Sequence, residues 1–116
     1  MEVLGIKGEN LAVKFLKKNG YRIIARNYKT PFGEVDIIAQ DGNTVVFIEV
    51  KTRADDFFGQ PFEAVNNRKR RKLKNVALFY LKRQSLEFPV RFDVLSIFYR
   101  ENGKKEIEHI KDAFEV

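Results

Sequence analysis

Residues 33–53 read GEVDIIAQDGNTVVFIEVKTR, and this stretch predicts a β-hairpin. One strand is expected over 34–40 and a second over 44–52. A glycine in the first place of a two-residue loop suits a type II′ turn, which favours a loop at Gly42-Asn43. The second strand has apolar residues at four successive positions, 45–48, so both of its faces are expected to be covered. It is therefore predicted to be a central strand.

Two registers are open for this hairpin. With the loop at Gly42-Asn43, Asp36 falls opposite Glu49, and with the loop one residue earlier, Glu34 falls opposite Glu49. Side chains of a strand alternate between its two faces, so both registers place the same charged residues on one face of the sheet. These residues are Glu34, Asp36, Glu49 and Lys51.

Charges at the end of a doubly covered strand need compensation. Two carboxylates directly across a ladder lie ~4.5–5.5 Å apart between Cβ atoms and repel each other. A divalent cation between them would relieve this repulsion, and Lys51 would then hold or activate a water that attacks a phosphate. The alternative is a salt-bridged polar patch in which Lys51 neutralises Glu34. The spacing leaves both interpretations open.

Outside the hairpin, hydrophobic periodicity predicts two helices and three further strands. The first helix is expected from about 3 to 18 and ends at Asn19-Gly20. The second should begin with Asn66 as its N-cap and run to about 84. Its buried apolar stripe is expected to be Leu73, Val76, Ala77, Tyr80 and Leu81. The remaining segments are strands over 21–28, 90–99 and 105–110, the last at a sheet edge, a turn over 29–33 and a loop over 53–61. The predicted fold class is α/β, a mixed sheet with helices packed on it, in a single domain over 1–116.

Composition limits the chemistry that this chain can support. The 116 residues include no Cys and one His, which excludes thiol catalysis and Cys-ligated zinc and makes a site built on several histidines a poor hypothesis. A catalytic metal would be held by carboxylates, as Mg²⁺ or Mn²⁺ is. The net charge of +6 favours a polyanionic partner. No long apolar run or signal-peptide core is present, so a cytoplasmic protein without membrane contact is expected. His109 is interpreted as a surface residue without a role.

A basic run opens the second predicted helix and is the clearest sign of a nucleic-acid partner. Its sequence over 68–74 is RKRRKLK, and helix N-termini favour phosphate. Lys69 is expected to point toward the sheet near the site, while Arg70, Arg71 and Lys74 spread outward along the nucleic-acid backbone. The preceding Phe57-Phe58 pair is either core or a wedge that stacks on unpaired bases. The full set of predicted nucleic-acid contacts is Lys69, Arg70, Arg71, Lys72, Lys74, Arg53 and Gln60.

The segments GEVDIIA (33–39) and VFIEVKTR (46–53) resemble the PD-(D/E)xK nuclease core, and the chain as a whole resembles the YraN family of endonuclease-like proteins. This family is related to the archaeal Holliday-junction resolvases. The resemblance extends through GENLA (8–12), Asn19-Gly20-Tyr21, RNY (26–28) and RFDV (91–94). Val35 stands where the superfamily motif has its proline, which the YraN-like pattern allows.

The resemblance implies a restriction-endonuclease-like three-layer fold of about five strands. It also implies a metal-dependent DNA endonuclease that acts on branched or recombination and repair intermediates. It implies Asp36 and Glu49 as metal ligands, with the Val50 carbonyl and Glu9 completing the site, and Lys51 as the catalytic lysine. Two roles remain open for Glu34: it either supports the metal ligands or forms an ion pair with Lys51. A homodimer and a separate ATP-driven remodelling protein are further partners to consider. The alternative function is a binding module without turnover in a repair or uptake machine.

Overall fold

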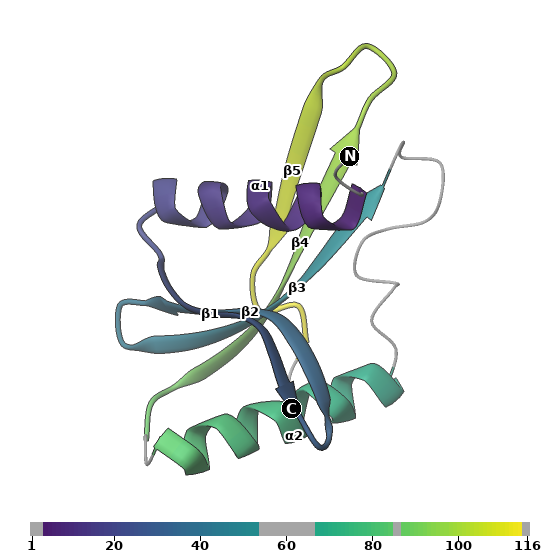
Figure 1. The fold of residues 1–116 in the computed structure, drawn as a ribbon. Coiled ribbons are helices and arrows are strands. Elements are labelled where there is room, and N and C mark those ends of the chain that lie inside the picture. Colours follow the sequence, from purple (N-terminus) through teal and green to yellow (C-terminus); the bar gives the residue numbers. More distant parts are fainter. Residues whose placement is uncertain (1–3, 54–66, 85–86, 115–116) are drawn as a thin grey trace.

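A five-stranded mixed sheet lies between two helices in the computed structural model of this protein (Figure 1). The structure describes residues 4–53, 67–84 and 87–114, with side chains described from Gly8 onward. Its elements are α1 (Leu4–Lys18), β1 (Arg22–Thr30), β2 (Gly33–Asp41), β3 (Thr44–Arg53), α2 (Asn67–Gln84), β4 (Val90–Tyr99) and β5 (Lys105–Ile110). The predicted α/β class and the three-layer arrangement are confirmed. In the described part of the chain, neither helix has the length and apolar character needed to cross a membrane.

The strands follow one another across the sheet in the order β1-β2-β3-β4-β5. Among the described strands, β3 and β4 pair in parallel, and the other neighbours pair antiparallel. A parallel pair needs a crossover, and α2 lies in the connection between β3 and β4. β3 is thus the central strand, as its continuous apolar run predicts.

The β2–β3 hairpin has the register with its loop at Gly42-Asn43. Asp41 pairs with Thr44 and Ile37 pairs with Ile48. Gly42 has a φ of 61°, whereas Asn43 is not among the residues with positive φ, as a type II′ turn requires. Of the two registers that the sequence left open, the structure has the one whose turn type favours Gly42 in its first place.

Each face of the sheet has its own apolar core. α1 covers one face, where Ala12 and Leu16 pack with alternate residues of β2, β3 and β4. α2 covers the other face with four of the five residues predicted for its stripe, Leu73, Val76, Ala77 and Tyr80, while Leu81 is half-buried. α1 ends as predicted: Gly20 has a φ of 88°, and the Tyr21 N–H donates to the Leu16 carbonyl at 2.9 Å.

Strand β1 is longer than predicted and ends at Thr30 rather than Tyr28. The Thr30 hydroxyl donates to the Gly33 carbonyl at 2.9 Å and accepts the Phe32 N–H at 3.0 Å. These two bonds close a two-residue loop at Pro31-Phe32, so the ladder continues to the Thr30–Gly33 pair. The predicted N-cap Asn66 lies outside the described residues.

A buried polar network fixes β4 to β5 on the α1 side of the sheet. Asp93 is 1% exposed, and its carboxylate accepts two hydrogen bonds from the Arg91 guanidinium, both at 2.9 Å. It also lies 2.7 Å from Nε2 of His109 and accepts the Asp112 N–H at 3.0 Å. Burial alone would raise the pKa of Asp93, but these hydrogen bonds hold it below its usual range.

The interpretation of His109 as a surface residue was wrong. Its side chain is 9% exposed, bonds to Asp93 and packs against the rings of Phe15 and Tyr21. The network continues from Arg91 to the Tyr21 hydroxyl at 2.7 Å and to Asp41 at 3.0 Å. These residues lie on the opposite face of the sheet from α2, so they stabilise the fold away from the cleft described below.

Candidate active site

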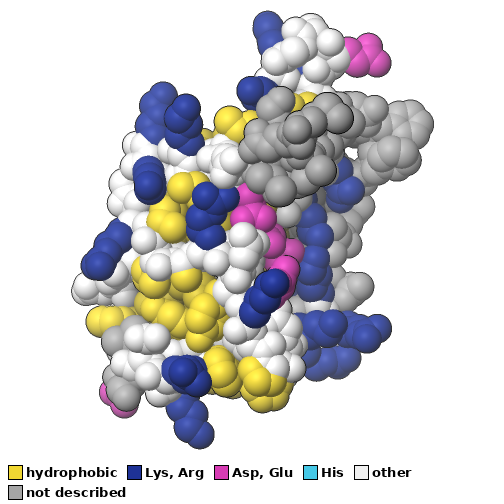
Figure 2. Space-filling view, in the orientation of Figure 1, with side chains coloured by type: hydrophobic (Ala, Val, Ile, Leu, Met, Phe, Trp, Pro, Cys, Tyr) yellow, Lys and Arg dark blue, Asp and Glu magenta, His cyan; other side chains and the backbone are white. Residues whose placement is uncertain are grey.

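A cleft of about 660 Å³ lies where β2 and β3 meet the N-terminal half of α2. Figure 2 shows a narrow group of acidic side chains with Lys and Arg on both sides. The cleft brings together the four charged residues that were predicted to share one face of the hairpin, together with several residues of the basic helix. Its lining is Gly33, Glu34, Asp36, Glu49, Val50, Lys51, Arg68, Lys69, Lys72 and Leu73.

Asp36 lies just beyond the last backbone pair between β2 and β3, which is Ile37 with Ile48. Its carboxylate takes the place of a backbone acceptor there, because Oδ2 accepts the Val50 N–H at 2.8 Å. Burial, and then the nearby charge of Glu49, raise the pKa of Asp36 to about 6. The carboxylate therefore carries an electrostatic cost when it is ionised.

Glu49 is the most buried carboxylate of the cleft, at 7% exposure. Its Oε2 lies 3.0 Å from Nζ of Lys69 and 3.9 Å from Nζ of Lys51. Two ammonium groups thus share one carboxylate oxygen. Burial and the neighbouring Lys69 lower the pKa of Lys51. The salt-bridged patch considered above paired Lys51 with Glu34, but the structure pairs Lys51 with Glu49.

The other residues proposed for the metal site lie in different surroundings. Glu34 is exposed at the rim of the cleft. Val50 lines the cleft and holds Asp36 through its N–H. Glu9 lies on α1, where its carboxylate is 3.7 Å from Arg26, and it is not among the described residues that line the cleft. Within the described ranges, no three His, Cys, Asp or Glu side chains are grouped to hold a metal.

The basic run divides between two flanks of α2. Arg68, Lys69 and Lys72 line the cleft. Arg70 lies over the ring of Phe114 at 5.4 Å, so the expectation that it spreads outward was wrong, and Lys74 lies on the same flank. Arg71 is exposed, as expected. Residues 68 and 72 are one helical turn apart, as are 70 and 74, which explains the division.

One predicted contact lies elsewhere, and one residue of the cleft was missed. Arg53 ends β3, paired with Phe98 of β4, outside the cleft lining. Gln60 and the Phe57-Phe58 pair lie outside the described residues. Arg68 lines the cleft, although the sequence placed it only within the run. Its spacing of four from Lys72 was the signal that could have identified it.

The donor set of the cleft fits a hard divalent cation. Mg²⁺ is commonly bound by one or two carboxylates and takes its other oxygens from water and phosphate, so Asp36 and Glu49 suffice as protein side chains. Burial, and then the charge of Glu49, raise the pKa of Asp36, so a cation beside this carboxylate would favour its ionised form. The Lys69 ammonium supplies part of that compensation at Glu49.

Comparison with known proteins places these residues in a family. The model of the uncharacterised protein family UPF0102, which is the YraN family, matches residues 8–97. A UPF0102 protein of Thermodesulfovibrio yellowstonii is 51% identical over 111 residues, covering 96% of this chain and 95% of the relative. Another, from Geotalea uraniireducens, is 49% identical over 114 residues, covering 97% of this chain and 90% of the relative. The family resemblance inferred from the motifs is confirmed.

Among solved structures, the chain is similar to Pyrococcus furiosus SfsA in complex with Ca²⁺. The identity is 12% and the TM-score is 0.38, with 97% of this chain and 63% of the other covered.

Proposed function

The chain belongs to the UPF0102 family, and we propose that it is a metal-dependent nuclease that hydrolyses phosphodiester bonds of DNA in the cleft between β2, β3 and α2. One observation carries this proposal. Two carboxylates of adjacent strands share a cleft with two lysines, and one of the carboxylates has a raised pKa. A fold-stabilising salt bridge has no need of the second, costly carboxylate. A divalent-cation site can use both carboxylates as ligands.

In this proposal Asp36 and Glu49 would hold Mg²⁺ or Mn²⁺, which when bound neutralises the phosphate and lowers the pKa of a water. The Val50 N–H orients Asp36 through its 2.8 Å bond. Lys51, on the same face of β3 as Glu49, positions the attacking water through Nζ. Lys69 lies 3.0 Å from Glu49 and lines the same cleft, so its ammonium can also bind a phosphate oxygen of the substrate.

The nucleic-acid contacts of the proposal come from the basic flank of α2, which is the side of the helix with Arg68, Lys69 and Lys72. Arg68 and Lys72 line the same cleft as the carboxylates, so they can hold phosphates on either side of the reacting one. Such contacts do not distinguish sequences. The proposed substrate is therefore chosen by its shape, and branched or recombination intermediates are the first to test.

A binding module without turnover is the second candidate. The 3.0 Å ion pair between Lys69 and Glu49 favours it, because a cation of the protein itself already compensates this carboxylate. In that case DNA would bind the basic flank, and divalent cations would have no effect on the protein.

The test is a cleavage assay on duplex, single-stranded, flap and four-way-junction DNA with Mg²⁺, with Mn²⁺ and with EDTA. The wild type should cut at least one substrate with Mg²⁺ or Mn²⁺ and none with EDTA. Glu49→Gln should cut none, because it loses half of the charge that holds the cation. Glu108→Gln, a change at an exposed glutamate of β5, is the matched control and should cut as the wild type does. Cleavage by Glu49→Gln at the wild-type rate would refute the proposed site.

A further inference from the structure

A second hollow lies farther along the same flank of α2 as the cleft. It measures about 590 Å³ and lies between the β1–β2 turn and the C-terminal half of the helix. Phe32 of the turn is 52% exposed and meets Phe79 of α2 edge-to-face, with 6.2 Å between ring centroids. The lining is Pro31, Phe32, Asn75, Leu78, Phe79, Lys82 and Arg83.

The turn holds Phe32 in this exposed position. The Thr30 hydroxyl bonds both the Phe32 N–H and the Gly33 carbonyl, and Pro31 fixes its own φ. A large aromatic side chain presented by a stiff turn pays little conformational entropy when a ligand packs on it. Two charged side chains lie beside the rings: Lys82 lines the hollow, and the Arg83 guanidinium lies 5.5 Å from the centroid of Phe79.

The hollow and the cleft belong to one continuous flank. Residues 68, 72, 75, 79, 82 and 83 follow one another at helical spacings of three and four, with one step of one at the end. The first two line the cleft and the others line the hollow. The turn joins them on the sheet side, since Gly33 lines the cleft and Phe32 the hollow. From Lys69 to Phe79 the helix rises ~15 Å, the span of a few nucleotides.

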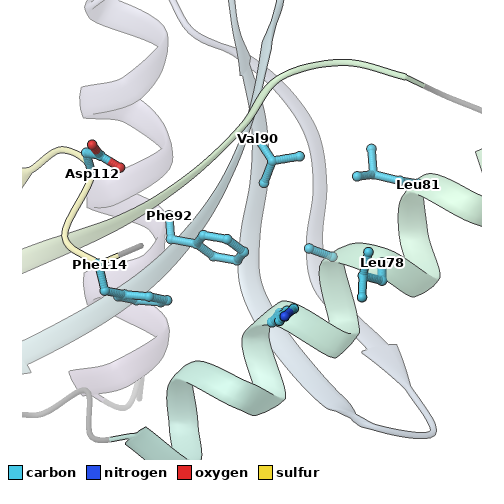
Figure 3. A pocket seen from close by; sticks show the side chains of 8 residues that line it. Leu78, Leu81, Val90, Phe92, Asp112 and Phe114 are labelled. Carbon is cyan, nitrogen blue, oxygen red and sulfur yellow. The ribbon is translucent and has the colours of Figure 1, made fainter. Parts of the chain in front are cut away.

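The opposite flank of α2 has a hollow of a different kind, and Leu78, which lies between the two flanks, lines both hollows. Figure 3 shows Leu78 and Leu81 of the helix facing Val90, Phe92 and Phe114, in a hollow of about 440 Å³. Asp112 and Lys74 also line it, so its charges cancel. A polyanion is therefore favoured on the first flank, where the basic lining residues of the helix outnumber the acidic residues of the lining. These basic residues are Arg68, Lys69, Lys72, Lys82 and Arg83.

We propose that the hollow at Phe32 and Phe79 binds an unpaired nucleobase of a strand whose backbone follows the basic flank of α2 from the cleft. The inference rests on the proposed function and deepens it, because it assigns the substrate a single-stranded segment beside the bond to be cut. Aromatic rings accept any base by stacking, and the flanking cations hold the phosphates, so the site selects unpaired strands rather than sequences.

The experiment measures binding by fluorescence anisotropy in EDTA, with labelled oligo(dT) and with an abasic oligomer of the same length. Phe32→Ala should weaken oligo(dT) binding about fivefold or more and leave the abasic oligomer unchanged, because only the stacked base is lost. Lys72→Ala should weaken both oligomers alike. Phe88→Ala, at a phenylalanine that is 40% exposed and lines neither hollow, should change neither.

Several results would overturn the base site. One is a wild type that binds neither oligomer, and another is a Phe32→Ala protein that binds oligo(dT) as tightly as the wild type. A loss of binding to phosphatidylglycerol vesicles on Phe32→Ala, with oligo(dT) binding intact, would identify a membrane-facing surface instead. The base site and the nuclease fail separately. If the wild type cuts no DNA but Phe32→Ala weakens binding to oligo(dT) alone, the base site is supported and the nuclease is refuted. If the wild type cuts DNA and Phe32→Ala binds oligo(dT) normally, only the base site is refuted.

Discussion

Replacing Lys51 with alanine should reduce cleavage by about 10²- to 10⁴-fold while the affinities for DNA and for divalent cations stay nearly unchanged. Lys51 is assigned to the water rather than to the cation, so its loss leaves both carboxylates in place. This variant is also expected to stay folded, because the buried carboxylate of the cleft keeps an ion-pair partner. Glu49 keeps Lys69 at 3.0 Å when the more distant Lys51, at 3.9 Å, is removed.

The measurement is a single-turnover cleavage rate, combined with anisotropy for DNA and a thermal melt for folding. Lys14→Ala is the matched control, because it removes an exposed lysine of α1, which covers the face of the sheet opposite the cleft. It should cut at close to the wild-type rate. If Lys51→Ala cuts DNA as fast as the wild type, the lysine has no part in the reaction and the proposed mechanism is wrong.

The second large effect concerns stability. Asp93→Asn should destabilise the protein by about 3–5 kcal/mol, because it removes the anion that pairs the partly buried Arg91. For a chain of this size the melting temperature should fall by about 10–20 °C. The pKa of Asp93 lies below its usual range, so the wild type should itself lose this contribution as the pH falls through that pKa.

Asp41→Asn provides the control for this network. Asp41 bonds the same guanidinium at 3.0 Å, but its side chain is 41% exposed, so its loss should cost no more than about 1 kcal/mol. The measurement is a thermal melt of the wild type, Asp93→Asn and Asp41→Asn at neutral pH. An Asp93→Asn protein that melts within two or three degrees of the wild type would mean that the network contributes little to the fold.

Local patterns in the sequence were sufficient for most of the fold. The hairpin over 33–53 follows from one glycine and the alternation of side chains, and β4 and β5 have the predicted ends at 90–99 and 105–110. The end of β1 was missed because the hydroxyl of Thr30 makes its own bonds, which extend the ladder by two residues. Whether a segment forms a helix or a strand follows from the pattern of a few neighbouring residues. A side-chain hydrogen bond that extends a strand does not show in that pattern.

The misses at the site have a different origin. His109 lies beside Asp93, sixteen residues away, and this pairing depends on how β5 registers with β4. Likewise, helical spacing separates Arg68 and Lys72 from Arg70 and Lys74, but only the fold determines which pair meets the carboxylates. The exposure of Phe32 depends on α2 lying beside the turn.

The proposed function depends on a divalent cation held by Asp36 and Glu49. Without metal, ionised Asp36 destabilises the fold, because its pKa is raised to about 6 from 3.8. The folded protein then holds the proton more tightly than the unfolded chain, so this cost is absent near pH 3, grows between pH 4 and 6, and is complete above. Asp36→Asn in EDTA should therefore melt at or above the wild-type temperature at pH 7, and this advantage should vanish near pH 3.

The most direct measurement adds Mg²⁺ to these two proteins at pH 7 and follows their thermal melts. At tenfold excess over Kd, Mg²⁺ should stabilise the wild type by about 1.4 kcal/mol, a rise of several degrees. Asp36→Asn should show little or no rise, because one of its two carboxylates is gone. If Mg²⁺ and Mn²⁺ leave the wild-type melting temperature unchanged, the cleft is a salt-bridged patch and the metal-dependent mechanism is refuted.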